Sequence, residues 1–158
     1  QLKNSGKADA DANTILALLA RSQGQSTIAR DLATEVVEGE KRPTRAKVEA
    51  LRLLAQLTYQ KQNFAESAIL YRQVTQFQSE AYDYFQLGIS EQNSGQTDRA
   101  IIALKTAVEL APSYVEAHRV LAAILKSQGK EDESNKHQQL ALLHEQRMRK
   151  LWQSSQPK

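Results

Sequence analysis

The sequence has 158 residues, a formal net charge of +3, 41% hydrophobic and 25% charged residues. These proportions are ordinary for a folded domain and exclude a disordered or low-complexity chain. The chain contains no Cys, which excludes disulfides, thiol nucleophiles and thiolate metal sites. It also contains no apolar run of about 18 residues that could span a membrane. No targeting segment is visible, so the sequence leaves the compartment unknown.

A set of small and apolar residues recurs four times along the chain. The pattern has five positions and is clearest from Leu87 to Ala107. It recurs 33 residues earlier, a further 38 residues earlier, and 34 residues later. In every copy the first position is Leu, the second is Ala or Gly, and the fourth is Ala or Ser. The four rows are Leu16, Ala17, Gly24, Ala29, Val36; Leu54, Ala55, Gln62, Ser67, Val74; Leu87, Gly88, Gly95, Ala100, Ala107; and Leu121, Ala122, Gly129, Ser134, Ala141. Antiparallel helices approach closely only where side chains are small, so the pattern predicts four helix pairs.

In chain order, we expect helices near residues 9–23, 26–38, 45–61, 64–77, 81–94, 97–110, 115–128 and 131–152. Glycines in the third column end first helices, because Gly tolerates the left-handed conformation after a helix C-terminus. Gln62 breaks that column, with Asn63 beside it as a substitute. The pairs correspond to repeats near 10–47, 48–80, 81–114 and 115–148 within a single domain, 1–158.

Three helix starts carry capping signals. Thr44 follows Pro43 and can open the third helix, and Thr97 can cap the sixth. Ser113 precedes Glu116 by three positions, which predicts a capping box at the start of the seventh helix.

Both ends depart from the pattern. Residues 4–7 (NSGK) resemble residues 93–96 (NSGQ), which suggests the remnant turn of an earlier repeat and a chain cut from a longer array; the first residue is Gln1, not Met. The last helix is longer than a repeat needs and carries a polar surface suited to a terminal cap. Three apolar residues of this helix, Met148, Leu151 and Trp152, lie beyond the length that a repeat needs. They form a candidate interface with another protein or another copy of the chain.

The third repeat resembles the tetratricopeptide repeat. Tyr84-x2-Leu87-Gly88, Ala100-x3-Leu104, Ala107 and Pro112 follow that family's order of residues. The resemblance implies an all-α fold, a right-handed superhelix of about four antiparallel helix pairs with a long C-terminal capping helix. It also implies a concave groove, lined by first helices, that binds peptides or partner helices. Glu91 departs from the pattern, since an aromatic residue is usual there.

The helical register places a set of aromatic, amide and basic residues on the face of the first helices opposite the second helices. The set is Arg21, Glu49, Arg52, Gln56, Tyr59, Tyr82, Phe85, Gln86, Ile89, Gln92, Arg119 and Lys126. The alternative is that these residues form a solvated face and packing between repeats. The family's carboxylate clamp of Lys, Asn and Arg is not reproduced at these positions.

We therefore expect a non-catalytic scaffold that binds a protein or peptide in the groove, as a monomer or weak homodimer. The alternative function is a structural or oligomerisation module that acts through the C-terminal helix. We expect no cofactor, and no phosphate loop, nucleophile elbow or paired carboxylates support an enzyme. His137 and His144 could share a helix face, but solvated histidines explain them better than a metal site. The small cluster of Arg147, Arg149, Lys150 and Trp152 is diluted by acidic residues and argues weakly for nucleic acid.

Overall fold

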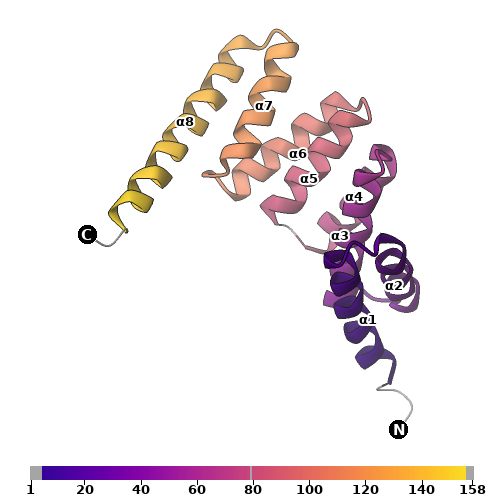
Figure 1. The fold of residues 1–158 in the computed structure, drawn as a ribbon. Coiled ribbons are helices and arrows are strands. Elements are labelled where there is room, and N and C mark those ends of the chain that lie inside the picture. The colour runs from indigo at the N-terminus through magenta and orange to yellow at the C-terminus, as the bar shows by residue number, and fades with distance from the viewer. Residues whose placement is uncertain (1–4, 79, 156–158) are drawn as a thin grey trace. The chain divides into compact units, whose positions relative to one another are not determined.

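A computed structural model describes residues 5–78 and 80–155, with side chains from residue 9, and all regular structure in these ranges is helical (Figure 1). The helices are α1 (Ser5–Ser22), α2 (Ser26–Gly39), α3 (Arg45–Gln60), α4 (Phe64–Phe77), α5 (Ala81–Asn93), α6 (Thr97–Leu110), α7 (Val115–Ser127) and α8 (Glu131–Ser154). The eight predicted helices are confirmed to within a few residues. The exception is α1, which begins at Ser5, four residues earlier than predicted. Residues 5–7 are therefore helical, and the prediction of a remnant turn there is wrong. Asn4, the first residue of that predicted turn, lies outside the described residues.

The turn inside each helix pair has one geometry, which explains the third column of the repeat. The amide of Gln96 donates to the carbonyl of Glu91 at 2.8 Å, as Lys130 does to Leu125 at 3.0 Å, and the other two turns repeat this bond. The residue before the donor has a positive φ, +82° at Gly95 and +62° at Gln62. Gln62 itself therefore takes the glycine position, and the prediction that Asn63 substitutes is wrong. Asn63 is instead the N-cap residue of α4.

One of the three predicted caps is confirmed. The Thr44 hydroxyl accepts the amide of Lys47 at 3.2 Å. Thr97 is the first residue of α6, one position inside the helix, and Gln96 is the N-cap residue. The capping box at Ser113 is also wrong. The chain makes one more turn there, in which the Tyr114 amide donates to the carbonyl of Ala111 at 2.9 Å, and Tyr114 becomes the N-cap residue.

The chain divides into two compact units, Gln1–Ser79 and Glu80–Lys158, each holding two helix pairs. In the first unit, α1 packs on α2 and α3, α2 on α3, and α3 on α4. Its core joins small residues of α1 and α2, such as Ala17 and Ala33, to Leu53 and Leu57 of α3. The hydroxyl of Ser67 donates to the carbonyl of Ala55 at 3.0 Å, so the fourth column can supply a hydrogen bond as well as a close crossing.

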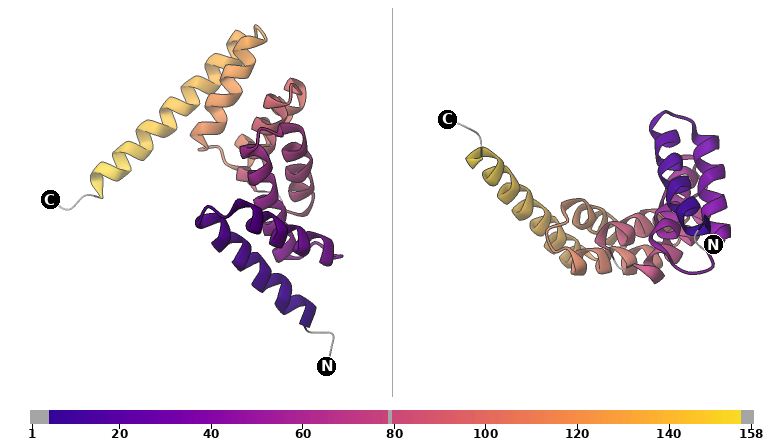
Figure 2. Two further views of the ribbon diagram at one scale, coloured as in Figure 1. Left: turned by 45° about the vertical axis from the view of Figure 1, so that its right-hand side comes forward. Right: turned by 90° about the horizontal axis from the view of Figure 1, so that it is seen from below.

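In the second unit, α5 packs on α6, α6 on α7, and α7 on α8. The closest crossing is at Gly88, where an added Cβ would lie 2.6 Å from Cγ of Leu104. Ser134 of α8 repeats the bond made by Ser67, donating to the carbonyl of Ala122 at 2.8 Å. Glu91, the unexpected acid, is buried. Helix α8 runs well past the N-terminal end of α7, as the left-hand view of Figure 2 shows.

The first column is buried in the second unit but not in α1. Leu87 and Leu121 are buried and Leu54 is half-buried, whereas Leu16 is 49% exposed. Leu121 is covered because α6 packs against α7, and Leu54 packs against the core that α2 and α3 share. Among the described residues, no helix covers Leu16 in the way that α6 covers Leu121, and the corresponding side of α1 is exposed.

Candidate functional site

The first unit carries a groove between two first helices, α1 and α3. It has a volume of about 940 Å³, and its lining combines apolar and charged side chains. The lining residues are Ala10, Asp11, Thr14, Ile15, Leu18, Glu40, Thr44, Arg45, Ala46 and Glu49. Three carboxylates and one guanidinium line this groove, and Arg52 neutralises one of the carboxylates, Glu49, which leaves a small excess of negative charge.

Ile15 and Leu18 were not among the predicted groove residues. The signal for them was the apolar run from Ile15 to Ala20, which exceeds what a helix buried on one side requires. In α1 the inward positions are taken by Ala17 and Ala20, and Ile15 is 66% exposed. Large side chains outside and small ones inside leave an apolar surface available for contact.

The predicted groove residues of the first unit are engaged with one another. Arg52 pairs with Glu49 at 2.9 Å within α3. Arg21 of α1 donates to the side-chain oxygen of Gln56 in α3. The ring of Tyr59 meets the ring of Phe64 edge to face, with centroids 5.0 Å apart. These contacts restrict the side chains on the first-helix faces.

In the second unit, Phe85 and Tyr114 form an aromatic pair with centroids 5.0 Å apart. Phe85 also packs against the core of α6 and α7, so it contributes to folding, while Tyr82 is 42% exposed. Burial, with smaller effects from Glu116 and Tyr82, raises the pKa of Tyr114 to about 12. Tyr114 was missed by the sequence reasoning, because it lies in the turn before α7.

The remaining predicted residues of this unit do not form one cluster. Gln86, Ile89 and Gln92 of α5 are half-buried. The side-chain oxygen of Gln92 is buried, with no hydrogen-bond partner in the described part of the chain. Arg119 reaches across to Glu145 of α8 at 2.8 Å, and Lys126 is exposed.

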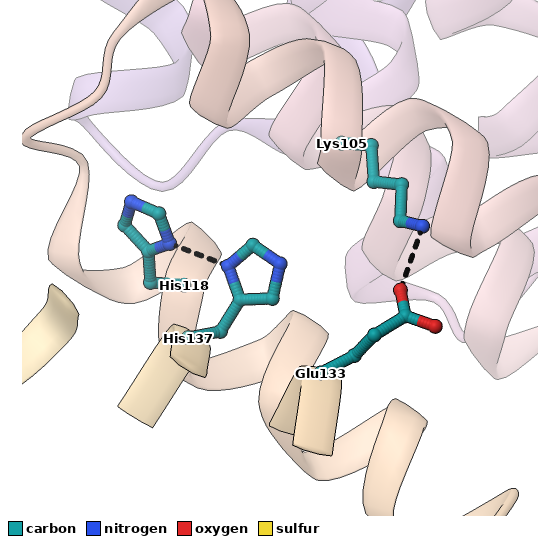
Figure 3. A network of polar contacts seen from close by, with 4 residues as sticks. All are labelled: Lys105, His118, Glu133 and His137. Atoms are coloured by element: carbon teal, nitrogen blue, oxygen red, sulfur yellow. Dashed lines mark hydrogen bonds and ion pairs between the residues drawn. The ribbon is translucent and has the colours of Figure 1, made fainter. Parts of the chain in front are cut away.

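A histidine pair links α7 to α8 (Figure 3). His118 Nε2 lies 3.0 Å from the carbonyl oxygen of Pro112, and because a carbonyl only accepts, this nitrogen carries a proton. In neutral His118 the other nitrogen, Nδ1, is therefore an acceptor, and it receives the Nδ1 proton of His137 at 2.8 Å.

The charges around His137 oppose its protonation. Burial, followed by His118, Lys136 and Lys105, lowers its pKa from the usual value, and Glu133 opposes them only weakly. The carboxylate of Glu133 is held by Lys105 at 3.0 Å, and this pairing lowers the pKa of Glu133. His144 stacks on His118 with centroids 6.2 Å apart. Within the described residues, no three His, Asp or Glu side chains are placed to hold a metal ion.

Comparison with known proteins identifies the family. The tetratricopeptide-repeat profile matches residues 9–81 and 85–146. This chain belongs to the tetratricopeptide-repeat family. A comparison with curated protein sequences finds no match.

Solved structures share this tetratricopeptide fold. MamA superposes with a TM-score of 0.82 at 19% identity, covering 89% of this chain and 81% of that one. YrrB, described as a TPR protein with an unusual peptide-binding site, gives 0.78 at 19% identity, covering 87% and 70%. An O-GlcNAc transferase mutant from Thermobaculum terrenum gives 0.65 at 29% identity, covering 78% of this chain and 23% of that one. The all-α solenoid expected from the sequence is confirmed.

The C-terminal helix of this tetratricopeptide chain has its own apolar surface. Met148, Leu151 and Trp152 are 64%, 66% and 65% exposed. They follow Ala141 and His144 on one helix face, the face that packs on α7 further up. None of the helices in the described ranges has the length and hydropathy of a membrane-spanning segment.

Proposed function

We propose that this chain is a non-catalytic scaffold that binds a protein or peptide on the faces of its first helices. The observation that carries the proposal is the α1–α3 groove, whose lining includes the exposed side chains of Ile15 and Leu18 together with carboxylates. Binding grooves combine an apolar floor with a few polar groups that fix orientation. YrrB, which is similar in fold, is described as a peptide-binding protein, and this supports the same class of activity here.

The first-helix face of the second unit is a further part of this proposal. Tyr82, Gln86, Ile89, Arg119 and Lys126 offer aromatic, amide, apolar and basic groups on α5 and α7. Tyr and Arg are common anchors in protein interfaces, because each joins a large contact area to directed polar atoms.

The test is a selection of random displayed peptides on the immobilised full chain, followed by affinity measurement. Selected peptides should lose at least about tenfold in affinity for the groove variant Asp11→Arg/Ile15→Lys. The control variant Ile102→Lys adds a charge at a similarly exposed apolar position of α6 and should bind normally. Tyr82→Ala tests the second unit without touching the core packing of Phe85. Equal binding to all variants, or no selected peptide, would reject the groove.

A second candidate function is an interaction module that acts through the C-terminal helix. It is favoured by the exposed face of Met148, Leu151 and Trp152, which no described part of α7 covers. The variant Arg147→Glu/Leu151→Glu separates the two candidates, because it changes this helix and leaves the α1–α3 groove intact.

A further inference from the structure

The exposed face of α8 is the continuation of a packing face. Ala141 is buried and His144 half-buried against α7, and the next turns of the same face bring Met148, Leu151 and Trp152. These three residues lie beyond the start of α7 and are each about two-thirds exposed. An amphipathic helix of this kind docks with residues spaced i, i+4 and i+7, as His144, Met148 and Leu151 are.

The opposite charge is found on the first unit. Asp11, Glu40 and Glu49 line the α1–α3 groove with Arg45, and Glu49 is already paired with Arg52, so two carboxylates remain against one guanidinium. The end of α8 carries Arg147, Arg149 and Lys150 beside its apolar residues, with no acidic residue after Glu145 in that helix. The groove and the end of α8 therefore match in both apolar character and charge.

The apolar surface of α1 extends from the groove onto its open side. Leu19 is 51% exposed, whereas Leu57 and Ile124, at the same position of later repeats, are 2% and 5% exposed. Leu57 lies in the core shared with α2, and Ile124 in the core shared with α6. This position of the repeat is thus one that a helix covers elsewhere in the chain.

We infer that the end of α8 of one copy docks on the α1–α3 groove of a second copy, with Met148, Leu151 and Trp152 on Ile15 and Leu18. This inference rests on the proposed groove function and names its occupant. The two surfaces differ, so the contact is head to tail, and each bound copy presents a further groove and a further helix end. Association is therefore open-ended and weakens as salt screens the charges.

The test uses the full chain and two variants that each disable one surface. Sedimentation of the wild type between roughly 1 and 200 µM should show a rising average mass, and more salt should lower it. The groove variant Asp11→Arg/Ile15→Lys and the tail variant Arg147→Glu/Leu151→Glu should each stay monomeric over this range. The control Ile102→Lys should associate like the wild type, and circular dichroism should give the same helicity for all three.

Mixing the two variants gives the decisive measurement. The groove variant retains an intact α8 and the tail variant an intact groove, so the mixture should form a 1:1 heterodimer that grows no further. Its dissociation constant should be within about threefold of that for the first wild-type association step. A monomeric wild type, a mixture without heterodimer, or a groove variant that still associates would overturn the inference; the last result would indicate contact between two α8 helices.

Peptide selection on the groove separates the two proposals. If the wild type is monomeric but selected peptides bind the groove, only this inference fails; if no peptide binds either, the proposed function fails with it.

Discussion

Replacing Gln62 by Gly should stabilise the fold, although it removes a side chain. Gln62 has a φ of +62° in a turn whose three counterparts are glycines with φ between +73° and +82°. A left-handed conformation costs an L-residue about 1–2 kcal/mol. Glycine gives back about 0.4–1 kcal/mol, because its unfolded chain has more conformations to lose. The free energy of unfolding should therefore rise by about 0.8 kcal/mol, the difference between the midpoints of these two ranges.

The assay is urea unfolding followed by circular dichroism. A thermal melt of the same variant should show its midpoint rising by roughly 2–3 °C. Gly95→Ala is the reverse change and should destabilise by a similar amount, without a steric contribution, since no heavy atom lies within 4 Å of the added Cβ. Gln96→Gly is the matched control, because Gln96 has an ordinary φ of −92° and its side chain makes no capping bond. If Gln62→Gly were neutral or destabilising while Gly95→Ala destabilised, the strain argument at Gln62 would be refuted.

Three further predictions concern packing, capping and pH. Gly88→Ala should lower the free energy of unfolding by about 1 kcal/mol despite the better helix propensity of Ala, because the new methyl group meets Leu104; denaturant unfolding should show that the cost vanishes in a Leu104→Ala background. Thr44→Ala should cost about 1 kcal/mol in the same assay by removing the observed cap, whereas Thr97→Ala should have almost no effect. Since the pKa of His137 is lowered in the folded chain, the unfolded chain binds more protons, and stability should be flat above about pH 6.5 and decrease as the pH falls below it. His137→Gln should reduce that decrease between pH 7.5 and 5, and an unchanged profile would contradict the assignment.

The fold could be predicted from the sequence because its determinants are local and repeated. Small residues at Ala17, Ala55, Gly88 and Ala122 mark the crossings, and the turn positions after them mark the helix ends. Capping was harder to predict, because it depends on a single residue of register. At Ser113 one backbone bond in the preceding turn moved the helix start by one position and left the expected cap outside.

The histidine pair could have been found by combining two columns of the repeat. Ala122 of α7 and Ser134 of α8 are in contact across the pair of helices. His118 lies one turn before Ala122, and His137 lies nearly one turn after Ser134. Antiparallel helices bring these positions together. Sequence reasoning compared His137 only with His144 on the same helix, which is why it considered a single solvated face.

The candidate groove was predicted less well, because its position depends on what the pattern leaves uncovered. The register gives the direction of each side chain, but in α5 it marked Phe85 as groove-facing without showing that this ring also packs on the core. In α1 the same register omitted Ile15 and Leu18, since their importance comes from the small size of Ala17 and Ala20 beneath them.

The two ends of the repeat array differ in how their outer positions are filled, and this difference favours a head-to-tail contact through the groove. In α6 the residues that face α7 include Ile101 and Leu104, and the corresponding positions of α8 are Asn135 and Gln138. The outer side of α8 is thus polar and offers little apolar surface to the exposed side of α1. Its apolar residues lie further along the helix and on the face turned towards α7. A second copy would therefore be held by the end of α8 in the acidic groove, and not by an extension of the regular stacking of repeats.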